Sequence, residues 1–351
     1  MTTSKEYKLP SLSFLLVKDY PRPWQEFWEP LYSLCRNLGV NVNSALEVFR
    51  LVYECVSREE EGRRVSTGFL VGDSAELREK FPDSAGIAIE RENILEATRR
   101  IRSLFGIVDG FTSAFIVGKD GMLEDARLMP IIEGVPEEDT FASNELHGYC
   151  EALKKTPGYG LVALGSFRTA KLFFDGRLHS EIYFSGKIGE WACRPLNESL
   201  EKLDQAASVK GIDRRILYKI FSVAIIMSNH RKGGTIIVGD HEEVLSQSEA
   251  PRWRLDGTNI LDLRGSRESH LFNLSTQEFA LVVSRSGELK ASSVRLMAKV
   301  PDRAKVELAA TDGGRHRSAA EITASTDSVA LVVSDDGPIT AYVEGKRILR
   351  V

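Results

Sequence analysis

Gly313-Gly314-Arg315-His316-Arg317-Ser318-Ala319-Ala320-Glu321 is the stretch of this chain that decides its fold. Three side chains that can carry positive charge follow two glycines. Glycine tolerates positive φ without steric cost, so the backbone can turn sharply and approach a ligand closely. Two arginines can bind phosphate oxygens in bidentate fashion, and the histidine between them can donate or accept a proton. The stretch therefore predicts a loop that binds an oligophosphate and opens a helix over 317–324.

Length and composition indicate an ordinary globular protein. The 351 residues suit two or three domains, and 42% of them are hydrophobic and 27% charged. A net charge of -4 argues against a generally nucleic-acid-binding surface. The apolar run 223–227 is too short to span a bilayer, and the N-terminus lacks the charged-then-apolar order of a signal peptide. Four cysteines without C-x-x-C spacing read as buried thiols, so we expect a cytoplasmic protein with no membrane partner.

The order of patterns along the chain predicts three regions. Apolar residues at three- and four-residue spacing over 24–34 and 45–52 indicate helices, and strand patterns follow at 68–72 and 113–123, so residues 1–140 read as a helical and α/β region. Residues 141–205 read as a connecting region rich in β-hairpins, with strands at 161–165, 172–174 and 179–184. No internal repeat at solenoid period is visible. Residues 206–351 form the third region.

The third region opens with the clearest helix of the chain. An apolar stripe at Ile216, Ile220, Val223 and Met227 predicts a helix over 212–230. A buried strand is expected at 235–240, and further strands at 279–284, 288–294, 329–334 and 339–343. The region is therefore of the α/β class.

Three stretches of this region together resemble one known family. They are Gly233-Gly234-Thr235-Ile236-Ile237-Val238-Gly239-Asp240, the stretch 313–321 quoted above, and the hairpin Val329 to Tyr342 with its turn Ser334-Asp335-Asp336. In this order they resemble the diadenylate cyclase (DAC) domain, the nucleotide-binding domain of the bacterial DNA-integrity-scanning protein and its relatives. The resemblance covers roughly the last 140 residues, the size of one domain. It implies a mixed central β-sheet flanked by helices, preceded here by an α/β regulatory region.

The resemblance also implies a reaction. Members of the family join two ATP molecules into cyclic di-AMP, with two domains facing each other across a two-fold axis and each holding one ATP. It implies a divalent metal ion, Mg²⁺ or Mn²⁺, and a homo-oligomer with face-to-face domains. Arg315, His316 and Arg317 would bind the phosphates, and His316 would also take part in catalysis. ATP or cyclic di-AMP would be the ligand.

The chain departs from the family pattern at one motif. Where the family has Asp-Gly-Ala before the middle hairpin, this chain has Glu278-Phe279-Ala280. Glu278 keeps the carboxylate expected to bind metal and activate the attacking hydroxyl, but it is one methylene longer. The ring of Phe279 could stack on adenine or block it, and Ala280 follows at the nucleotide. Gly314 replaces a threonine that contacts phosphate, whereas Ser334 and Asp335 keep the serine-acid pattern of the closing turn.

Three functions remain open at this point. The first is an active diadenylate cyclase controlled by an N-terminal sensor domain. The second is a degenerate domain that binds ATP or the cyclic dinucleotide without turnover, and the third is a scaffold that only dimerises. The retained basic stretch argues against the third. Because no DNA-binding module follows the cyclase-like region, a DNA-scanning role is not expected.

Overall fold

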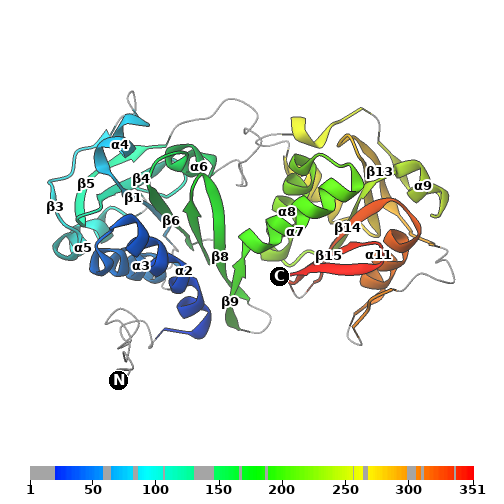
Figure 1. Cartoon of the computed structure of the whole chain (residues 1–351), viewed down its shortest axis with the longest axis horizontal. Helices are drawn as coiled ribbons and strands as arrows, with labels where there is room; N and C mark the ends of the chain where they lie inside the picture. Colours follow the sequence, from blue (N-terminus) through cyan, green and yellow to red (C-terminus); the bar gives the residue numbers. More distant parts are fainter. Residues whose placement is uncertain are drawn as a thin grey trace, which may run out of the picture. The chain divides into compact units, whose positions relative to one another are not determined.

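The computed structural model describes residues 20–57, 65–81, 86–105, 107–129, 146–165, 168–185, 189–255, 257–263, 268–298, 306–309, 312–335 and 337–351. The chain forms two compact units (Figure 1). The first comprises residues 1–132 and 148–194, and the second comprises residues 133–147 and 195–351.

The first unit is built on a mixed β-sheet. Within the described residues its strands lie in the order β2-β5-β4-β1-β6-β7-β8-β9, and β3 also pairs with β5. Strands β1 and β4 run parallel, and the neighbours on either side of this pair run antiparallel to it. The strands are β1 (Thr67–Gly72), β2 (Gly86–Ile87), β3 (Glu92–Asn93), β4 (Ser113–Gly118), β5 (Met122–Leu128), β6 (Gly158–Leu164), β7 (Thr169–Phe174), β8 (Arg177–Ser185) and β9 (Glu190–Pro195).

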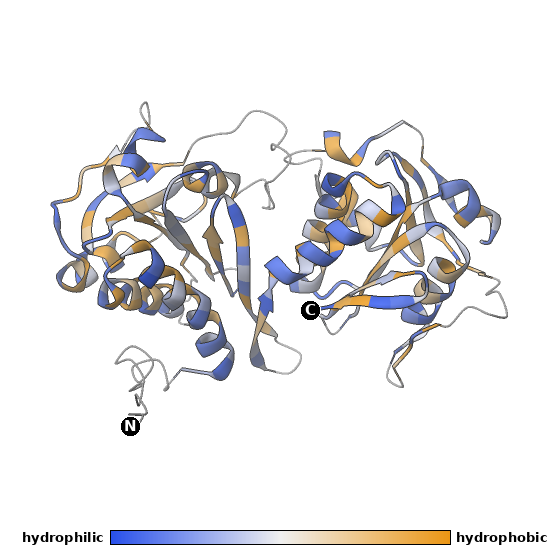
Figure 2. Cartoon of the chain, viewed as in Figure 1, coloured by the Kyte–Doolittle hydropathy of each residue, from blue (hydrophilic) through white to orange (hydrophobic). Residues whose placement is uncertain are grey.

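Apolar helix faces cover this sheet. In α2 (Arg22–Leu38) the buried residues recur at three- and four-residue spacing, and the helix ends where Gly39 adopts a φ of 68°. Helix α3 (Val42–Ser57) packs on β6, β1 and β7. The shorter helices are α4 (Ser74–Glu79), α5 (Ile94–Ser103) and α6 (His147–Leu153). The hydrophobic residues concentrate in the strands and on one side of the helices (Figure 2).

The second unit contains another mixed sheet. Its described strands lie in the order β11-β13-β12-β10-β14-β15-β16, with β10 and β12 parallel and the other pairs antiparallel. Every residue of β10 is buried, as its β-branched composition predicts. The strands are β10 (Gly234–Gly239), β11 (Trp253–Arg254), β12 (Ala280–Ser284), β13 (Leu289–Val294), β14 (Ser328–Val333), β15 (Ile339–Val343) and β16 (Lys346–Arg350).

The helices of the second unit surround this sheet. Helix α8 (Arg214–Asn229) buries the predicted apolar stripe, and Asp213 caps it by accepting from the backbone N–H of Arg215. Helix α11 (Gly314–Ser325) packs on β14 and β15. The others are α7 (Leu196–Lys210), α9 (His241–Ser246), the 3-10 turn η3 (Ile260–Asp262) and α10 (Glu268–Ser275).

The α/β class and the mixed central sheet are therefore confirmed. One local expectation is wrong: the helix predicted over 317–324 begins at Gly314, so the basic residues form its first turn rather than a loop. Alanine and serine after the arginines allow this turn to join the helix. The predicted hairpin strands of 141–205 continue the sheet of the first unit. The boundary expected at residue 140 lies outside the described residues.

Two further observations concern the chain as a whole. None of the described helices combines the length and apolar character that crossing a membrane requires. The four cysteines are free thiols, of which Cys35, Cys55 and Cys150 are buried.

Candidate nucleotide-binding site

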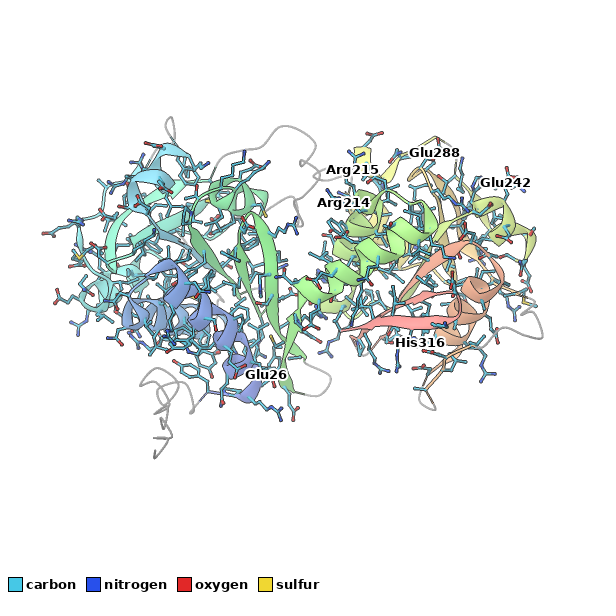
Figure 3. The ribbon with its side chains drawn as sticks, in the orientation of Figure 1. Glu26, Arg214, Arg215, Glu242, Glu288 and His316 are labelled. Carbon is cyan, nitrogen blue, oxygen red and sulfur yellow. The ribbon has the colours of Figure 1, made fainter. Side chains whose placement is uncertain are left out.

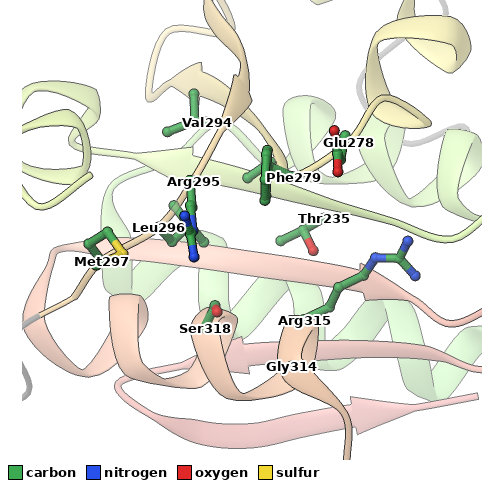
Figure 4. A pocket seen from close by; sticks show the side chains of 11 residues that line it. Thr235, Glu278, Phe279, Val294, Arg295, Leu296, Met297, Gly314, Arg315 and Ser318 are labelled. Carbon is green, nitrogen blue, oxygen red and sulfur yellow. The ribbon is translucent and has the colours of Figure 1, made fainter. Parts of the chain in front are cut away.

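A pocket of about 450 Å³ lies in the second unit at the amino ends of the parallel strands β10 and β12 (Figure 4). This volume falls within the range of roughly 300–1,000 Å³ typical of small-molecule sites. Eleven residues line it: Thr235, Glu278, Phe279, Ala280, Val294, Arg295, Leu296, Met297, Gly314, Arg315 and Ser318. They come from the start of two strands, the end of β13 and the first turns of α11.

The residues before β12 form one wall. Glu278 is exposed, and Phe279 keeps 45% of its surface accessible. Phe279 has a φ of 72°, in the left-handed region that bulky residues rarely occupy. Because Ala280 pairs with Val294, the next residues outward, Phe279 and Arg295, lie opposite each other, and the guanidinium carbon of Arg295 is 6.0 Å from the ring centroid.

The segment 295–297 is held by backbone pairing with residues 247–249. The N–H of Glu249 donates to the carbonyl of Arg295, and the N–H of Met297 donates to the carbonyl of Gln247, at 2.9 Å each. The Glu249 carboxylate also lies 3.3 Å from Nη1 of Arg295. These contacts fix one end of the pocket, where Leu296 and Met297 are apolar and Phe279 faces Arg295.

The opposite end is formed by the first turn of α11. Gly314 and Ser318 are four residues apart and share a helix face, and Arg315 lies beside them. Gly313 provides no side-chain cap, so the first N–H groups of the helix have no capping side chain as partner. Nη1 of Arg315 donates to Oδ2 of Asp335 at 2.9 Å, and Oδ1 of Asp335 accepts from the N–H of Gly233 at 3.0 Å. This end of the pocket therefore combines a cation with oriented backbone donors.

His316, labelled in Figure 3, is buried and does not line the pocket. Its Nε2 is 2.9 Å from Oγ of Ser334, and its Nδ1 is 3.1 Å from the hydroxyl of Tyr342. Burial, and then the neighbouring Asp312 carboxylate, raise the pKa of Tyr342 to about 12, so its hydroxyl keeps its proton at neutral pH. In a neutral imidazole one of these two ring nitrogens donates its hydrogen bond and the other accepts. His316 thus ties α11 to β15 and to the turn after β14.

The structure places the predicted site residues in two groups. Glu278, Phe279, Ala280, Gly314 and Arg315 line one pocket. The second group lies next to it: His316 is buried, Arg317 is exposed on the outer face of α11, and Ser334 and Asp335 contact the first turn of that helix. Asp336 lies outside the described residues.

The prediction missed six residues that line the pocket: Thr235, Val294, Arg295, Leu296, Met297 and Ser318. Thr235 and Ser318 stand inside the quoted motifs, and their place beside Gly234 and Arg315 could have indicated them. Nothing in the local sequence marks Arg295 or Met297, because sheet pairing brings them to the pocket.

Residues 223–347 match the family model described as DAC, DisA bacterial checkpoint controller nucleotide-binding. This segment is similar to a DAC domain. It contains every residue that lines the pocket.

Two solved structures are similar to part of the chain. One is a hypothetical membrane spanning protein from Bacillus cereus, at 18% identity and a TM-score of 0.29, covering 36% of this chain and 59% of that one. The other is a double mutant of DacA from Staphylococcus aureus, at 16% identity and a TM-score of 0.29, covering 38% of this chain and 87% of that one. The chain thus spans about three fifths of the Bacillus cereus protein. No curated protein matches the chain.

The donors of the DAC domain fit a magnesium or manganese ion that is bound together with phosphate. Mg²⁺ is usually held by one or two carboxylates, substrate phosphates and waters rather than by a cage of protein ligands. Glu278 supplies an exposed carboxylate at the pocket, and among the described residues it has no cationic partner. The described residues contain no group of three or more His, Cys, Asp or Glu side chains arranged for a metal ion. A metal here would rely on Glu278 and on the bound nucleotide.

Proposed function

We propose that the DAC domain binds ATP in this pocket and joins two ATP molecules into cyclic di-AMP. The observation that carries the proposal is that a single pocket brings together a carboxylate, an arginine and the uncapped start of a helix. Arginine and helix N-termini are the donors that phosphate oxygens prefer. We place the triphosphate at the Arg315 and Gly314 end.

The reaction consists of two identical transfers. In each, the 3′-oxygen of one nucleotide attacks the α-phosphorus of the other, a new P–O bond forms, and the bond to pyrophosphate breaks. The Glu278 carboxylate accepts the proton of the attacking hydroxyl. Positioning and stabilisation of phosphate charge supply most of the rate in such transfers. Because each nucleotide attacks the other, two DAC domains must face each other, so we expect a homo-oligomer.

Arg315 has two alternative partners in this scheme. It pairs with Asp335 in the structure, and both side chains are largely exposed, so water weakens this pair. A triphosphate carries more negative charge than one carboxylate, and Arg315 would turn toward it. Mg²⁺ or Mn²⁺, held by Glu278 and the phosphates, would neutralise charge on the leaving pyrophosphate.

Phe279 favours a second candidate function, a receptor that binds ATP or cyclic di-AMP without turnover. The ring projects at the pocket from a position where the family has glycine, next to the lengthened carboxylate of Glu278. A displacement of about 1 Å at the reacting atoms can lower the rate about a hundredfold. Binding would survive such a displacement, whereas catalysis would not.

The first unit would act as the sensor that controls the DAC domain, and the protein would work in the cytoplasm. The first unit has its own β-sheet and its own hydrophobic core, which supports the proposal that it is a module with a separate role.

One experiment separates the two candidates. The purified full chain is incubated with ATP and Mg²⁺ or Mn²⁺, and cyclic di-AMP is sought by mass spectrometry while ATP binding is measured by calorimetry. Product that accumulates over many turnovers supports the cyclase. Tight ATP binding without product supports the receptor, and absence of both product and nucleotide binding would refute the assignment of the pocket.

A further inference from the structure

The two units share the order of their first elements. In the first unit, α2 ends at Gly39 with a φ of 68°, and Val40 and Asn41 lead into the 16-residue helix α3. In the second, α7 ends at Gly211 with a φ of 59°, and Ile212 and Asp213 lead into the 16-residue helix α8. Asn41 and Asp213 each accept from backbone N–H groups at the start of the following helix.

The next strand and helix also correspond. Strand β1 ends at Gly72, and the carboxylate of Asp73 caps the six-residue helix α4. Strand β10 ends at Gly239, and the carboxylate of Asp240 caps the six-residue helix α9. A short edge strand and a longer helix follow in both units, β2 and α5 in the first and β11 and α10 in the second.

The hairpins match down to their backbone angles. The turn between β4 and β5 contains Gly121 with a φ of 84°, and the turn between β12 and β13 contains Gly287 with a φ of 87°. The turn between β7 and β8 is Asp175-Gly176, at 49° and 69°, and its counterpart between β15 and β16 is Glu344-Gly345, at 52° and 74°.

The sheets have the same strand order. Replacing β5-β4-β1-β6-β7-β8 by β13-β12-β10-β14-β15-β16 reproduces every pairing, including the single parallel pair in each sheet. The edge strands β2 and β11 occupy the same place next to β5 and β13. A chance agreement of element order, strand order and turn conformation is far less probable than a common fold, because connections could follow many other routes.

We infer that the first unit is a second copy of the DAC-type fold that has lost its nucleotide site. This inference goes beyond the proposed function, because it concerns residues outside the DAC domain, and it rests on that function only for the ligand. The loss is visible in the helix before β6. Among the residues buried at this helix, which also include Gly148, the spacing of Leu146, Tyr149, Cys150, Ala152 and Leu153 repeats that of His316, Ala319, Ala320, Ile322 and Thr323 in α11.

The chemistry of this helix differs in the copy. Counted from the same spacing, the buried Leu146, just before α6, takes the place of His316. An apolar side chain thus stands at the position that the buried histidine has in α11.

Tyr149 fills the space beside the strand position that corresponds to the pocket residue Thr235. Strand pairing makes Gly68 the counterpart of Thr235 and Gly160 the counterpart of Ala330. A Cβ on Gly68 would overlap the hydroxyl of Tyr149, and a Cβ on Gly160 would lie 2.7 Å from Cδ1 of its ring. The large Tyr149 thus stands where the second unit has the small Ala319. The two strand positions beside it are glycines, Gly68 and Gly160, where the second unit has Thr235 and Ala330. Gly68, the counterpart of Thr235, is covered by the side chain of Tyr149 and by the backbone of Gly110.

The filled space can be tested by stability alone, without any nucleotide. Gly68→Ala should lower the midpoint of thermal unfolding by roughly 5 °C or more, because its Cβ overlaps the Tyr149 hydroxyl. Tyr149→Phe should change it little, since among the described residues that hydroxyl has no hydrogen-bond partner. Combining the two should recover part of the loss. Tyr159→Phe, a change at another buried tyrosine, should not restore the unfolding midpoint of Gly68→Ala. If the double variants with Tyr149→Phe and with Tyr159→Phe had equal midpoints, the filled pocket would be overturned.

The lost site is tested by the number of nucleotides bound. We expect calorimetry of the full protein to give one bound ATP per chain. In Arg315→Ala, which weakens the site of the second unit, we expect no ATP to bind at another site. A second equivalent of ATP that persists in Arg315→Ala would overturn the inference. If the unmodified protein binds no nucleotide, the proposed function fails, while the coupling between Gly68 and Tyr149 still decides whether the first unit is a filled copy.

Discussion

At the scale of single residues, the backbone of Phe279 is strained, because its φ of 72° lies in the left-handed region. A left-handed φ costs a residue with a Cβ about 1–2 kcal/mol. Phe279→Ala and Phe279→Gly both remove the ring, but only glycine removes the strain. We therefore expect the glycine variant to have a free energy of unfolding about 1 kcal/mol higher than the alanine variant, measured by denaturant titration. Equal stabilities would show that the backbone at residue 279 is relaxed.

Arg315 is the residue on which nucleotide binding depends most directly. A hydrogen bond to a charged group contributes about 1.5–3 kcal/mol, so Arg315→Ala should weaken ATP binding roughly tenfold or more. Arg317→Ala is the matched control, since Arg317 is exposed and does not line the pocket. Calorimetry of both variants measures the difference. A larger loss in Arg317→Ala would place the phosphates on the outer face of α11.

Glu278 separates binding from turnover. Glu278→Gln keeps the length of the side chain but removes the charge and the proton acceptor. We expect cyclic di-AMP formation to fall at least about a hundredfold, while ATP binding measured without metal stays within a few-fold of the unmodified protein. Mass spectrometry of the product and calorimetry give the two readings. Unchanged product formation would mean that another carboxylate does this work.

At the scale of secondary structure, β10 sits against the end of α10. A Cβ on Gly234 would overlap the backbone carbonyl of Ser275, which cannot rotate away as a side chain could. Gly234→Ala should lower the free energy of unfolding by about 2 kcal/mol or more. In Gly314→Ala the added Cβ meets nothing within 4 Å and helix propensity improves, so this control should be neutral or slightly stabilising. Denaturant unfolding compares them, and equal effects would contradict the close approach.

Elements with strong local patterns were predictable from the sequence. The stripe of α8 and the β-branched run of β10 bury the residues that their periodicity indicates. The start of α11 was not predictable, because Gly313-Gly314 suggests a break and only its packing on β14 and β15 makes the basic residues helical. Strand β16 was also missed, since its alternation is weak and it sits at the sheet edge next to β15.

At the scale of the whole molecule, the buried thiol of Cys35 and the partly buried thiol of Cys193 make the free energy of unfolding depend on alkaline pH. Burial raises the pKa of Cys35 and of Cys193 to about 12, from 9.0 in the unfolded chain. Below pH 9 both states keep these protons and the stability is fully present. Between pH 9 and 12 only the unfolded state releases them, so the free energy of unfolding falls by about 1.4 kcal/mol per pH unit for each thiol.

Urea unfolding at pH 8 and pH 10 checks this expectation. Because Cys35 and Cys193 lie in the first unit, that unit should lose more stability than the second. Cys193→Ser removes one thiol and should reduce the dependence on pH. A first unit equally stable at both pH values would show that the thiols are accessible in the folded protein.

The sequence by itself determined the class of the second unit and its basic stretch, because helix and strand periodicity and contiguous motifs are local properties of the chain. Tertiary structure alone decided which residues share the pocket: Arg295 and Met297 arrive there through pairing with β12 and with residues 247–249. It also decided that the first unit repeats the fold of the second. In the proposed copy the large Tyr149 lies against Gly68 and Gly160, and such compensation in volume changes the local sequence while it leaves the strand order intact.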